Sequence, residues 1–256
     1  APKLENGLTI AFKGEIISKP YINMTIAMMR YFGAEVEWKE NSIVVASGSY
    51  TAKHFSVEAD WSAASYWYSI VALAKDADIT LYGLKQKSLQ GDAVVKEIYK
   101  NFGVATEFIA GGIRLTKSPI INHQSSIINF KDCPDIAQTV AVTCAALNIK
   151  ATLTGLKTLR IKETDRISAL HTELTKLGFS VDVEGDDLLI NRLSRTGDNL
   201  MGEAQVPIKT YDDHRMAMAF APLALHNSIT IMDENVVVKS YPNFWKDLDG
   251  VGLKTI

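Results

Sequence analysis

The segment Leu174-Thr175-Lys176-Leu177-Gly178-Phe179-Ser180-Val181 decides the fold, because the chain carries its pattern three times. An amphipathic helix ends at a glycine, and a short strand of alternating character follows. The other two copies are residues 29–36 and 99–104. A glycine just past the last helical turn can take the left-handed conformation that closes a helix. Polar turns at 39–41, 111–112 and 185–187 then predict a β-hairpin after each helix.

A second pattern alternates with the first and consists of an acidic residue, a helix rich in apolar and small residues, and a strand. Its helices are expected at 60–73, 135–147 and 213–225, and its strands at 79–81, 151–153 and 229–231. The run 140–146 has almost no polar face, which predicts a helix buried on nearly every side. The leading acidic residues, Asp60, Asp135 and Asp213, favour the positive end of each helix as caps.

Together the two patterns form a unit of strand, buried helix, strand, amphipathic helix and hairpin, with a period of roughly 75 residues. The chain opens with a strand at 8–12 and an amphipathic helix from Ser18, without the buried helix that precedes these elements elsewhere. It closes with a helix around 241–248, and only residues 251–256 stand where a hairpin is expected. We therefore expect a fragment cut at its opening end. The alternative is a complete chain whose terminal repeats are degenerate, because terminal repeats are often atypical. For the closing end alone, this alternative is the preferred interpretation.

Composition limits the classes of protein to which the chain can belong. Of 256 residues, 47% are hydrophobic and 22% are charged, which suits one large or two small folded domains. The net charge of −2 supplies no general basic field for nucleic acid or an anionic membrane. The two cysteines, Cys133 and Cys144, are too few for a disulfide framework, so a reducing cytosol is the simplest interpretation. We expect a soluble cytoplasmic chain with no membrane span and no targeting signal.

The densest polar cluster is residues 159–166, ahead of the helix that ends at Gly178. Lys162 and Arg166 are four residues apart, so they are expected on one helical face with Glu163 beside them. Cations at a helix N-terminus favour a bound anion rather than the helix itself. A solvated helix start with ordinary ion pairs is the alternative, and this cluster alone does not exclude it.

A second cluster, residues 211–219, places ionisable groups at the start of an apolar helix. Arg215 falls in the first turn of that helix, where a nearly buried arginine needs an anionic partner. A structural pair with Asp212 or Asp213 is an equal alternative to an anionic ligand. The sequence Asp212-Asp213-His214 also invites a metal site, but no other His or Cys cluster has ligand spacing.

Three more helix starts are polar and contain a proline: residues 18–21, 133–135 and 239–242. Proline near the first helical position is a start signal in itself, so each has a purely structural explanation. Helices of repeated units can nevertheless converge. Their positive ends would then bind one multiply charged anion.

With these motifs, the chain resembles the C-terminal part of the 5-enolpyruvylshikimate-3-phosphate synthase family, the shikimate-pathway transferases inhibited by glyphosate. The resemblance runs over nearly the whole chain, and the order and spacing of its motifs are specific although each motif alone is weak. The matching motifs are Ser18-Lys19-Pro20-Tyr21, Ser88-Leu89-Gln90-Gly91-Asp92, Pro134-Asp135, Lys162-Glu163-Thr164-Asp165-Arg166, Asp213-His214-Arg215-Met216-Ala217 and Lys239-Ser240-Tyr241-Pro242.

The resemblance implies an α+β fold of repeated βαβαββ units, of the inside-out α/β barrel type, in two domains that close on the substrates. Residues 1–57 would be the last part of a first domain that is otherwise missing, and residues 58–256 most of the second domain. The partners it implies are phosphoenolpyruvate, shikimate 3-phosphate and the missing N-terminal domain of the same protein. It implies no cofactor, no metal, no nucleic acid and no membrane.

The resemblance also implies roles for individual residues in the transfer of an enolpyruvyl group. Asp135 would take the proton of the shikimate hydroxyl, and Glu163 would handle the methylene proton, with the division between them left open. The remaining site residues would bind substrate: Arg166, Arg215 and Lys239 phosphoenolpyruvate, and Ser18, Tyr21 and Lys162 shikimate 3-phosphate. Thr158 stands at a further shikimate contact, and His214 is a weaker candidate near a phosphate.

The sequence departs from the family pattern at two places. Thr158 stands where the family usually has Asn, which puts one shikimate contact in doubt, and Trp61 follows Asp60 where a small residue is usual. By itself, the present chain would be inactive. The alternative from another class is a non-catalytic anion- or RNA-associated module of related fold, which would need a basic surface with interleaved aromatic side chains.

Overall fold

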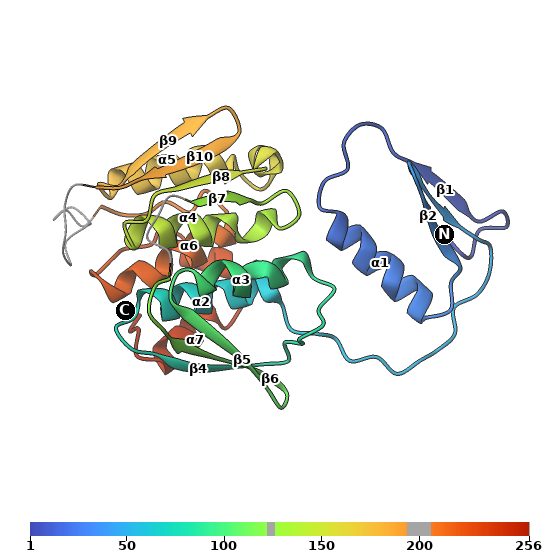
Figure 1. Ribbon diagram of the computed structural model, residues 1–256, viewed down its shortest axis with the longest axis horizontal. Helices are drawn as coiled ribbons and strands as arrows, with labels where there is room; N and C mark the ends of the chain where they lie inside the picture. The colour runs from blue at the N-terminus through green and yellow to red at the C-terminus, as the bar shows by residue number, and fades with distance from the viewer. Residues whose placement is uncertain (122–125, 194–205, 256) are drawn as a thin grey trace.

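The computed structural model describes residues 1–121, 126–193 and 206–255. Its two parts, which lie side by side in Figure 1, have separate hydrophobic cores. The smaller part, here called the N-terminal lobe (residues 1–45), has its core around Ile26 and Val45. The larger part, the main lobe (residues 59–255), has a continuous core from Trp61 to Leu248.

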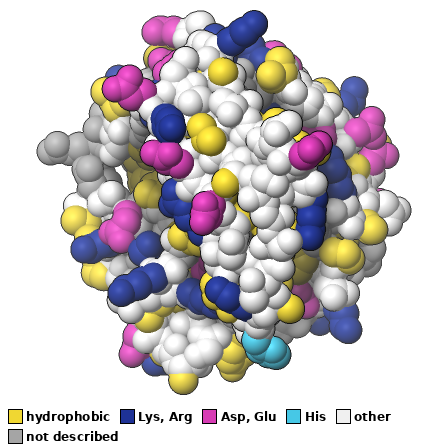
Figure 2. All heavy atoms as spheres, turned by 90° about the vertical axis from the view of Figure 1, so that its right-hand side faces the viewer, with side chains coloured by type: hydrophobic (Ala, Val, Ile, Leu, Met, Phe, Trp, Pro, Cys, Tyr) yellow, Lys and Arg dark blue, Asp and Glu magenta, His cyan; other side chains and the backbone are white. Residues whose placement is uncertain are grey.

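The N-terminal lobe is one helix packed on a three-stranded antiparallel sheet of strand order β1-β3-β2. Its elements are β1 (Leu8–Ala11), α1 (Lys19–Tyr31), β2 (Val36–Lys39) and β3 (Ser42–Val45). The strand and helix predicted here are both confirmed. On the side of the molecule that Figure 2 draws, Lys and Arg side chains are interspersed with Asp and Glu side chains among the described residues.

The first unit of the main lobe contains a buried helix, an antiparallel sheet of order β4-β6-β5 and a short amphipathic helix. Its elements are α2 (Trp61–Leu73), β4 (Asp78–Tyr82), the 3-10 turn η1 (Gly91–Val94), α3 (Val95–Lys100), β5 (Val104–Ile109) and β6 (Gly112–Lys117). Helix α2 starts where the sequence predicts, because the Asp60 side chain accepts a hydrogen bond from the Ser62 N–H at 2.8 Å.

The second unit repeats this order, with one added strand and a sheet of order β7-β8-β10-β9. Strand β7 runs parallel to β8, and the other pairs are antiparallel. The elements are β7 (Ser126–Asn129), the 3-10 turn η2 (Pro134–Ile136), α4 (Ala137–Ala146), β8 (Ala151–Thr154), η3 (Lys157–Ile161), α5 (Arg166–Lys176), β9 (Ser180–Glu184) and β10 (Asp187–Asn191).

The third unit is the least regular. It comprises α6 (His214–Phe220), η4 (Ala221–Leu225), η5 (Glu234–Lys239) and α7 (Phe244–Gly250). The predicted helix 213–225 is α-helical only to Phe220, because Pro222 enters a 3-10 turn. The strand predicted at 229–231 is wrong in extent, since Ile231 forms only an isolated parallel bridge with Ile208. The last helix begins at Phe244, three residues later than expected.

Two structural details support the internal repeat. Gly33, Gly103 and Gly178, the glycines predicted to close the amphipathic helices, have φ of 93°, 80° and 89°. The buried helices α2 and α4 also meet through a ladder of hydroxyl groups, in which Ser65 contacts Thr139 at 3.1 Å and Ser69 contacts Thr143 at 2.8 Å. Both pairs are 74 residues apart, so equivalent positions of successive units face each other.

This packing positions the candidate site, because α4, α5 and α6 pack against one another in the main lobe (Figure 1). None of the helices within the described ranges is both long and apolar enough to cross a membrane.

Candidate active site

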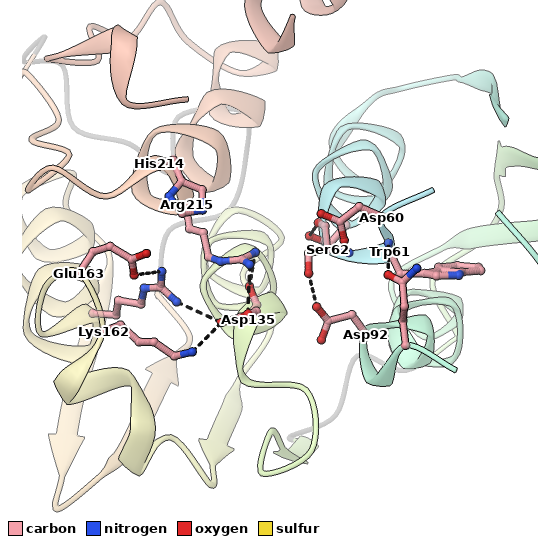
Figure 3. A network of polar contacts seen from close by, with 12 residues as sticks. Asp60, Trp61, Ser62, Asp92, Asp135, Lys162, Glu163, His214 and Arg215 are labelled. Atoms are coloured by element: carbon pink, nitrogen blue, oxygen red, sulfur yellow. Dashed lines mark hydrogen bonds and ion pairs between the residues drawn. The ribbon is translucent and has the colours of Figure 1, made fainter. Parts of the chain in front are cut away.

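Asp135 is the meeting point of three cations (Figure 3). Its Oδ1 lies 3.5 Å from Lys162 Nζ and 3.2 Å from Arg166 Nη1, and its Oδ2 lies 3.1 Å from Arg215 Nη2. The prediction that Asp135 caps its helix is wrong: α4 begins after Ile136 and has no side-chain cap. Pro134 starts a 3-10 turn there, and the carboxylate faces the cations instead.

Glu163 forms the second junction. Its Oε2 lies 2.7 Å from Arg166 Nη2, and its Oε1 accepts a hydrogen bond from Lys239 Nζ. Two carboxylates therefore connect all four basic side chains that the sequence assigned to one anion site. Those side chains come from the segment that leads into α5, from the first turns of α5 and α6, and from η5: Lys162, Arg166, Arg215 and Lys239.

Arg166 is the buried centre of this network, with 1% of its side chain exposed. Its Nε bonds Asp213 Oδ2 at 2.6 Å, and its Nη2 lies 3.4 Å from Asp213 Oδ1. Asp213 is fully buried and also caps α6, because its Oδ1 accepts a hydrogen bond from the Arg215 N–H at 2.8 Å. The alternative that paired Arg215 with Asp212 or Asp213 is wrong: Asp213 binds Arg166, and Arg215 binds Asp135.

The expectation that Lys162 and Arg166 share a helical face is also wrong. Asp165 caps α5 by accepting a hydrogen bond from the Ser168 N–H at 3.1 Å, so the helix begins only at Arg166. Lys162 lies in the extended connection that follows η3. The two cations meet through Asp135, not through helical periodicity.

Electrostatics keep both carboxylates ionised. Burial alone would raise the pKa of Asp135, but Arg215, Lys162 and Arg166 together outweigh it and lower the pKa. The hydrogen bond from Lys239, opposed by partial burial and aided by Arg166, lowers the pKa of Glu163 to about 2.

Two candidates for shikimate binding in the main lobe, His214 and Thr158, have side-chain atoms without hydrogen-bond partners among the described residues. His214 is 5% exposed, and burial followed by the charge of Arg215 lowers its pKa, so its imidazole is neutral at pH 7. Its Nδ1 and the buried Thr158 Oγ1 have no hydrogen-bond partner among the described residues. Both atoms could therefore receive a ligand or water.

Ser18 and Tyr21 belong to the N-terminal lobe, at the start of α1. Ser18 takes a left-handed conformation at φ 55°, and its side chain makes no capping hydrogen bond to α1. Burial raises the pKa of Tyr21, as do the nearby carboxyl groups of Asp92 and Asp135. Tyr21 is therefore close to the cation network, whereas the backbone N–H of Ser18 binds the carbonyl oxygen of Lys131 at 3.2 Å.

Sequence reasoning missed two residues of this region. Asp213 was expected as a cap, as a partner of Arg215 or as part of a metal motif, and Asp92 was quoted only as part of a motif. An acidic residue directly before a buried helix was the available signal for Asp213. Within the described ranges, no three His, Cys, Asp or Glu side chains form a group that could hold a metal ion.

The fold defines a structural class, that of the enolpyruvyl transferases. The enolpyruvyl transferase NikO from Streptomyces tendae superposes with a TM-score of 0.62 over 98% of this chain and 56% of its own, at 14% identity. An EPSP synthase from Acinetobacter baumannii superposes with a TM-score of 0.76 over 99% of this chain and 58% of its own, at 23% identity. At these identities the likeness concerns the fold.

Sequence similarity then gives the family. The profile of EPSP synthase (3-phosphoshikimate 1-carboxyvinyltransferase) matches residues 1–248, so the chain belongs to the EPSP synthase family. The family and the α+β fold implied by the sequence motifs are thus confirmed. A 3-phosphoshikimate 1-carboxyvinyltransferase of Bacteroides fragilis is 48% identical over 99% of this chain. Its counterpart in Methanospirillum hungatei is 36% identical over 97%. The chain spans 62% and 57% of the lengths of these two relatives.

Proposed function

We propose that the protein transfers the enolpyruvyl group of phosphoenolpyruvate to the 5-hydroxyl of shikimate 3-phosphate, and that these 256 residues supply one side of the site. The observation that carries the proposal is the linkage of four cations through Asp135 and Glu163. Such a cluster suits substrates that carry a carboxylate and phosphates. Each charge-assisted contact to them contributes about 1.5 to 3 kcal/mol.

In the first step, O5 of shikimate 3-phosphate attacks C2 of phosphoenolpyruvate. The O5–C2 bond forms, the O5 proton passes to Asp135, and C3 receives a proton from Glu163, which gives a tetrahedral adduct. In the second step, C3 returns a proton to Glu163, the bond between C2 and the phosphate oxygen breaks, and the leaving phosphate takes the proton held by Asp135. Protons are exchanged only between the substrates and the two carboxyl groups.

The ligand-free electrostatics suit Asp135 as a base but require a change at Glu163. Asp135 is ionised and can accept a proton. Glu163 is ionised as well, because Lys239 and Arg166 bind it. A substrate anion that takes over Lys239 and Arg166 removes the interactions that lower the pKa of Glu163. Binding would then turn this carboxylate into a usable acid, with the uptake of a proton.

Arg166, Arg215 and Lys239 would hold phosphoenolpyruvate. Lys162, Ser18 and Tyr21 would hold shikimate 3-phosphate, with Thr158 and His214 as further contacts. Ser18 and Tyr21 come from residues 1–57, which we assign to the end of a first domain, and the other side chains come from residues 58–256, most of a second domain. The cytoplasmic location predicted from the sequence stays a prediction.

The test is a chimera in which the part of the Bacteroides fragilis relative that this chain does not cover is joined to these 256 residues. Phosphate release is measured with phosphoenolpyruvate and shikimate 3-phosphate together and with each alone. We expect turnover by the chimera only with both substrates, and none by the 256 residues alone.

Each part of the proposal can fail separately. A folded chimera without phosphate release would overturn the proposed reaction. Turnover by the 256 residues alone would overturn the claim that they supply only one side of the site. A non-catalytic RNA-associated module would instead give a salt-dependent gel shift with RNA and no turnover.

A further inference from the structure

The segment 88–92 is a family motif that has no role in the proposed reaction. Its side chains form hydrogen bonds at the N-terminal end of α2. Gln90 Oε1 accepts a hydrogen bond from the Trp61 N–H at 2.9 Å, and Gln90 Nε2 donates to the Ala59 carbonyl oxygen at 2.8 Å. One side chain thus satisfies backbone groups on both sides of Asp60. The segment fixes the N-terminal end of α2 from outside the helix.

The same segment touches the N-terminal lobe. A Cβ atom added at Gly91 would lie 2.5 Å from the Asp132 carbonyl oxygen and 3.1 Å from Cβ of Pro20. Only glycine allows so close an approach. The segment is therefore in contact with α1 of the N-terminal lobe and with the connection that leads to Asp135.

Asp92 lies where these contacts meet, with its side chain fully buried. Its Oδ2 accepts a hydrogen bond from Ser62 Oγ in the first turn of α2 (Figure 3). Its Oδ1 has no hydrogen-bond partner among the described residues. The preceding residue, Gly91, packs against Pro20, which directly precedes Tyr21 in α1. The charge of Asp92 accordingly helps to raise the pKa of the Tyr21 hydroxyl, after burial. A buried carboxyl group is costly unless such partners hold it.

We propose that Asp92 is a positioning residue that joins the two lobes: its buried carboxyl group links Tyr21 of α1 to Ser62 of α2. Through this link it fixes the substrate-facing side chains of the N-terminal lobe relative to Asp135 and Arg215. The inference rests on the proposed function, in which Ser18 and Tyr21 contact shikimate 3-phosphate.

Other contacts between the lobes are weaker candidates for this role. The ion pair of Lys131 with Glu15 has side chains that are 39% and 68% exposed, and solvent screens such pairs. The hydrogen bond from the Ser18 N–H to the Lys131 carbonyl oxygen, 3.2 Å long, joins two connecting segments outside helices and strands. Asp92 is fully buried, and it lies against the first turns of two helices.

The Ser18 amide is also a reporter, because its hydrogen bond crosses from one lobe to the other. The Phe12 amide is a matched internal control, because it binds the Asn41 carbonyl oxygen, 2.9 Å away, within the N-terminal lobe. Amide hydrogen exchange is measured by NMR on the ligand-free 256-residue chain, in the wild type and in Asp92→Ala, Asp92→Asn and Tyr21→Phe. Asp76→Ala, at an exposed aspartate between α2 and β4, is the control variant.

We expect Asp92→Ala to speed exchange at Ser18 at least fivefold without changing Phe12, and Tyr21→Phe to have a smaller effect of the same kind. Asparagine at position 92 still accepts from Ser62 and should lie between alanine and wild type. Unchanged exchange at Ser18, or equal acceleration at Ser18 and Phe12, would overturn the proposal.

A second readout separates this inference from the proposed function. Dissociation constants for shikimate 3-phosphate and inorganic phosphate are measured on the same variants. Asp92→Ala should weaken shikimate 3-phosphate binding several-fold more than phosphate binding, and equal weakening would count against the positioning role. If shikimate 3-phosphate fails to bind the wild-type chain, the proposed function loses support, whereas exchange at Ser18 still decides the role of Asp92.

Discussion

The segments that precede α3 and α5 hold equivalent places in successive units but use their polar groups in opposite ways. At the start of α5, Lys162 and Arg166 extend toward carboxylates of other elements, in the site proposed here for anions. Ahead of α3, the segment 88–92 contains no Lys or Arg and bonds the neighbouring helix start. A helix N-terminus in this fold is therefore not an anion site by itself. In the roles proposed here, the side chains around a helix N-terminus decide whether it binds a ligand or joins the two lobes.

The largest expected effect is on catalysis at the start of α5. Glu163→Gln removes the group proposed to exchange a proton with C3 and should lower the turnover of the chimera by about 10² to 10⁴-fold. Phosphate release under saturating substrates measures it. Glu97→Gln, in the first turn of α3, is the matched control at the other helix and should leave turnover unchanged. Equal losses in both variants would contradict the contrast between the starts of α3 and α5.

The next effect is on stability, and it depends on the burial of Arg166. Arg166→Ala leaves the fully buried carboxylate of Asp213 without its ion-pair partner, which should lower the free energy of unfolding by about 3 to 5 kcal/mol. Urea denaturation measures the loss. Arg160→Met is the control, because Arg160 pairs with Asp165 and Asp186 at the partly exposed surface and should cost less than about 1 kcal/mol. The double variant Arg166→Met with Asp213→Asn should regain part of the loss.

Much of the fold could be predicted from the sequence because its signals are local. Glycines at helix ends, polar turns and the apolar run 140–146 each act within a few residues. The irregular third unit was predicted less well. Pro222 lies in the 3-10 turn that follows α6 and ends its α-helical part. Ile231 pairs only in an isolated bridge with Ile208, a partner distant in sequence that local patterns do not reveal.

The partners within the site could not be predicted, because they depend on how separate units pack. Spacing placed Lys162 and Arg166 on one helix face, whereas Asp165 caps α5 between them. The pairing of Arg166 with Asp213 joins residues 47 positions apart, and that of Arg215 with Asp135 joins residues 80 positions apart in sequence. The motifs predicted which charged residues belong to the site. Their ion-pair partners could not be predicted, because these pairs form only when the units pack in three dimensions.

The pH dependence of the unfolding free energy tests Asp92, in the segment that precedes α3. Burial, together with the charge of Asp135, raises the pKa of Asp92 to about 6, from its ordinary value of 3.8. Between these values the folded state binds the extra proton, so the unfolding free energy should fall as pH rises from about 4 to about 6. The difference between wild type and Asp92→Asn should change by about 3 kcal/mol over this window. Carboxylates with lowered pKa values, such as Glu163, are present in both proteins and cancel. A difference independent of pH would show that Asp92 does not titrate in this way.

The smallest effect on stability is expected at Lys239, whose side chain is 55% exposed. Lys239→Met should change the free energy of unfolding by less than about 1 kcal/mol, because solvent already screens its ion pair. It should nevertheless raise the pKa of Glu163 above its value of about 2, since the hydrogen bond from Lys239 is the largest cause of the lowering. A stability change below about 1 kcal/mol corresponds to a rise of less than about one pKa unit. The small stability contributed by that lowering is present above about pH 4.5 and lost as pH falls toward 2. Carbon-13 NMR titration of the Glu163 carboxyl group measures the shift. An unchanged titration would mean that the backbone hydrogen bond of Glu163 and the charge of Arg166 suffice to hold Glu163 ionised without Lys239.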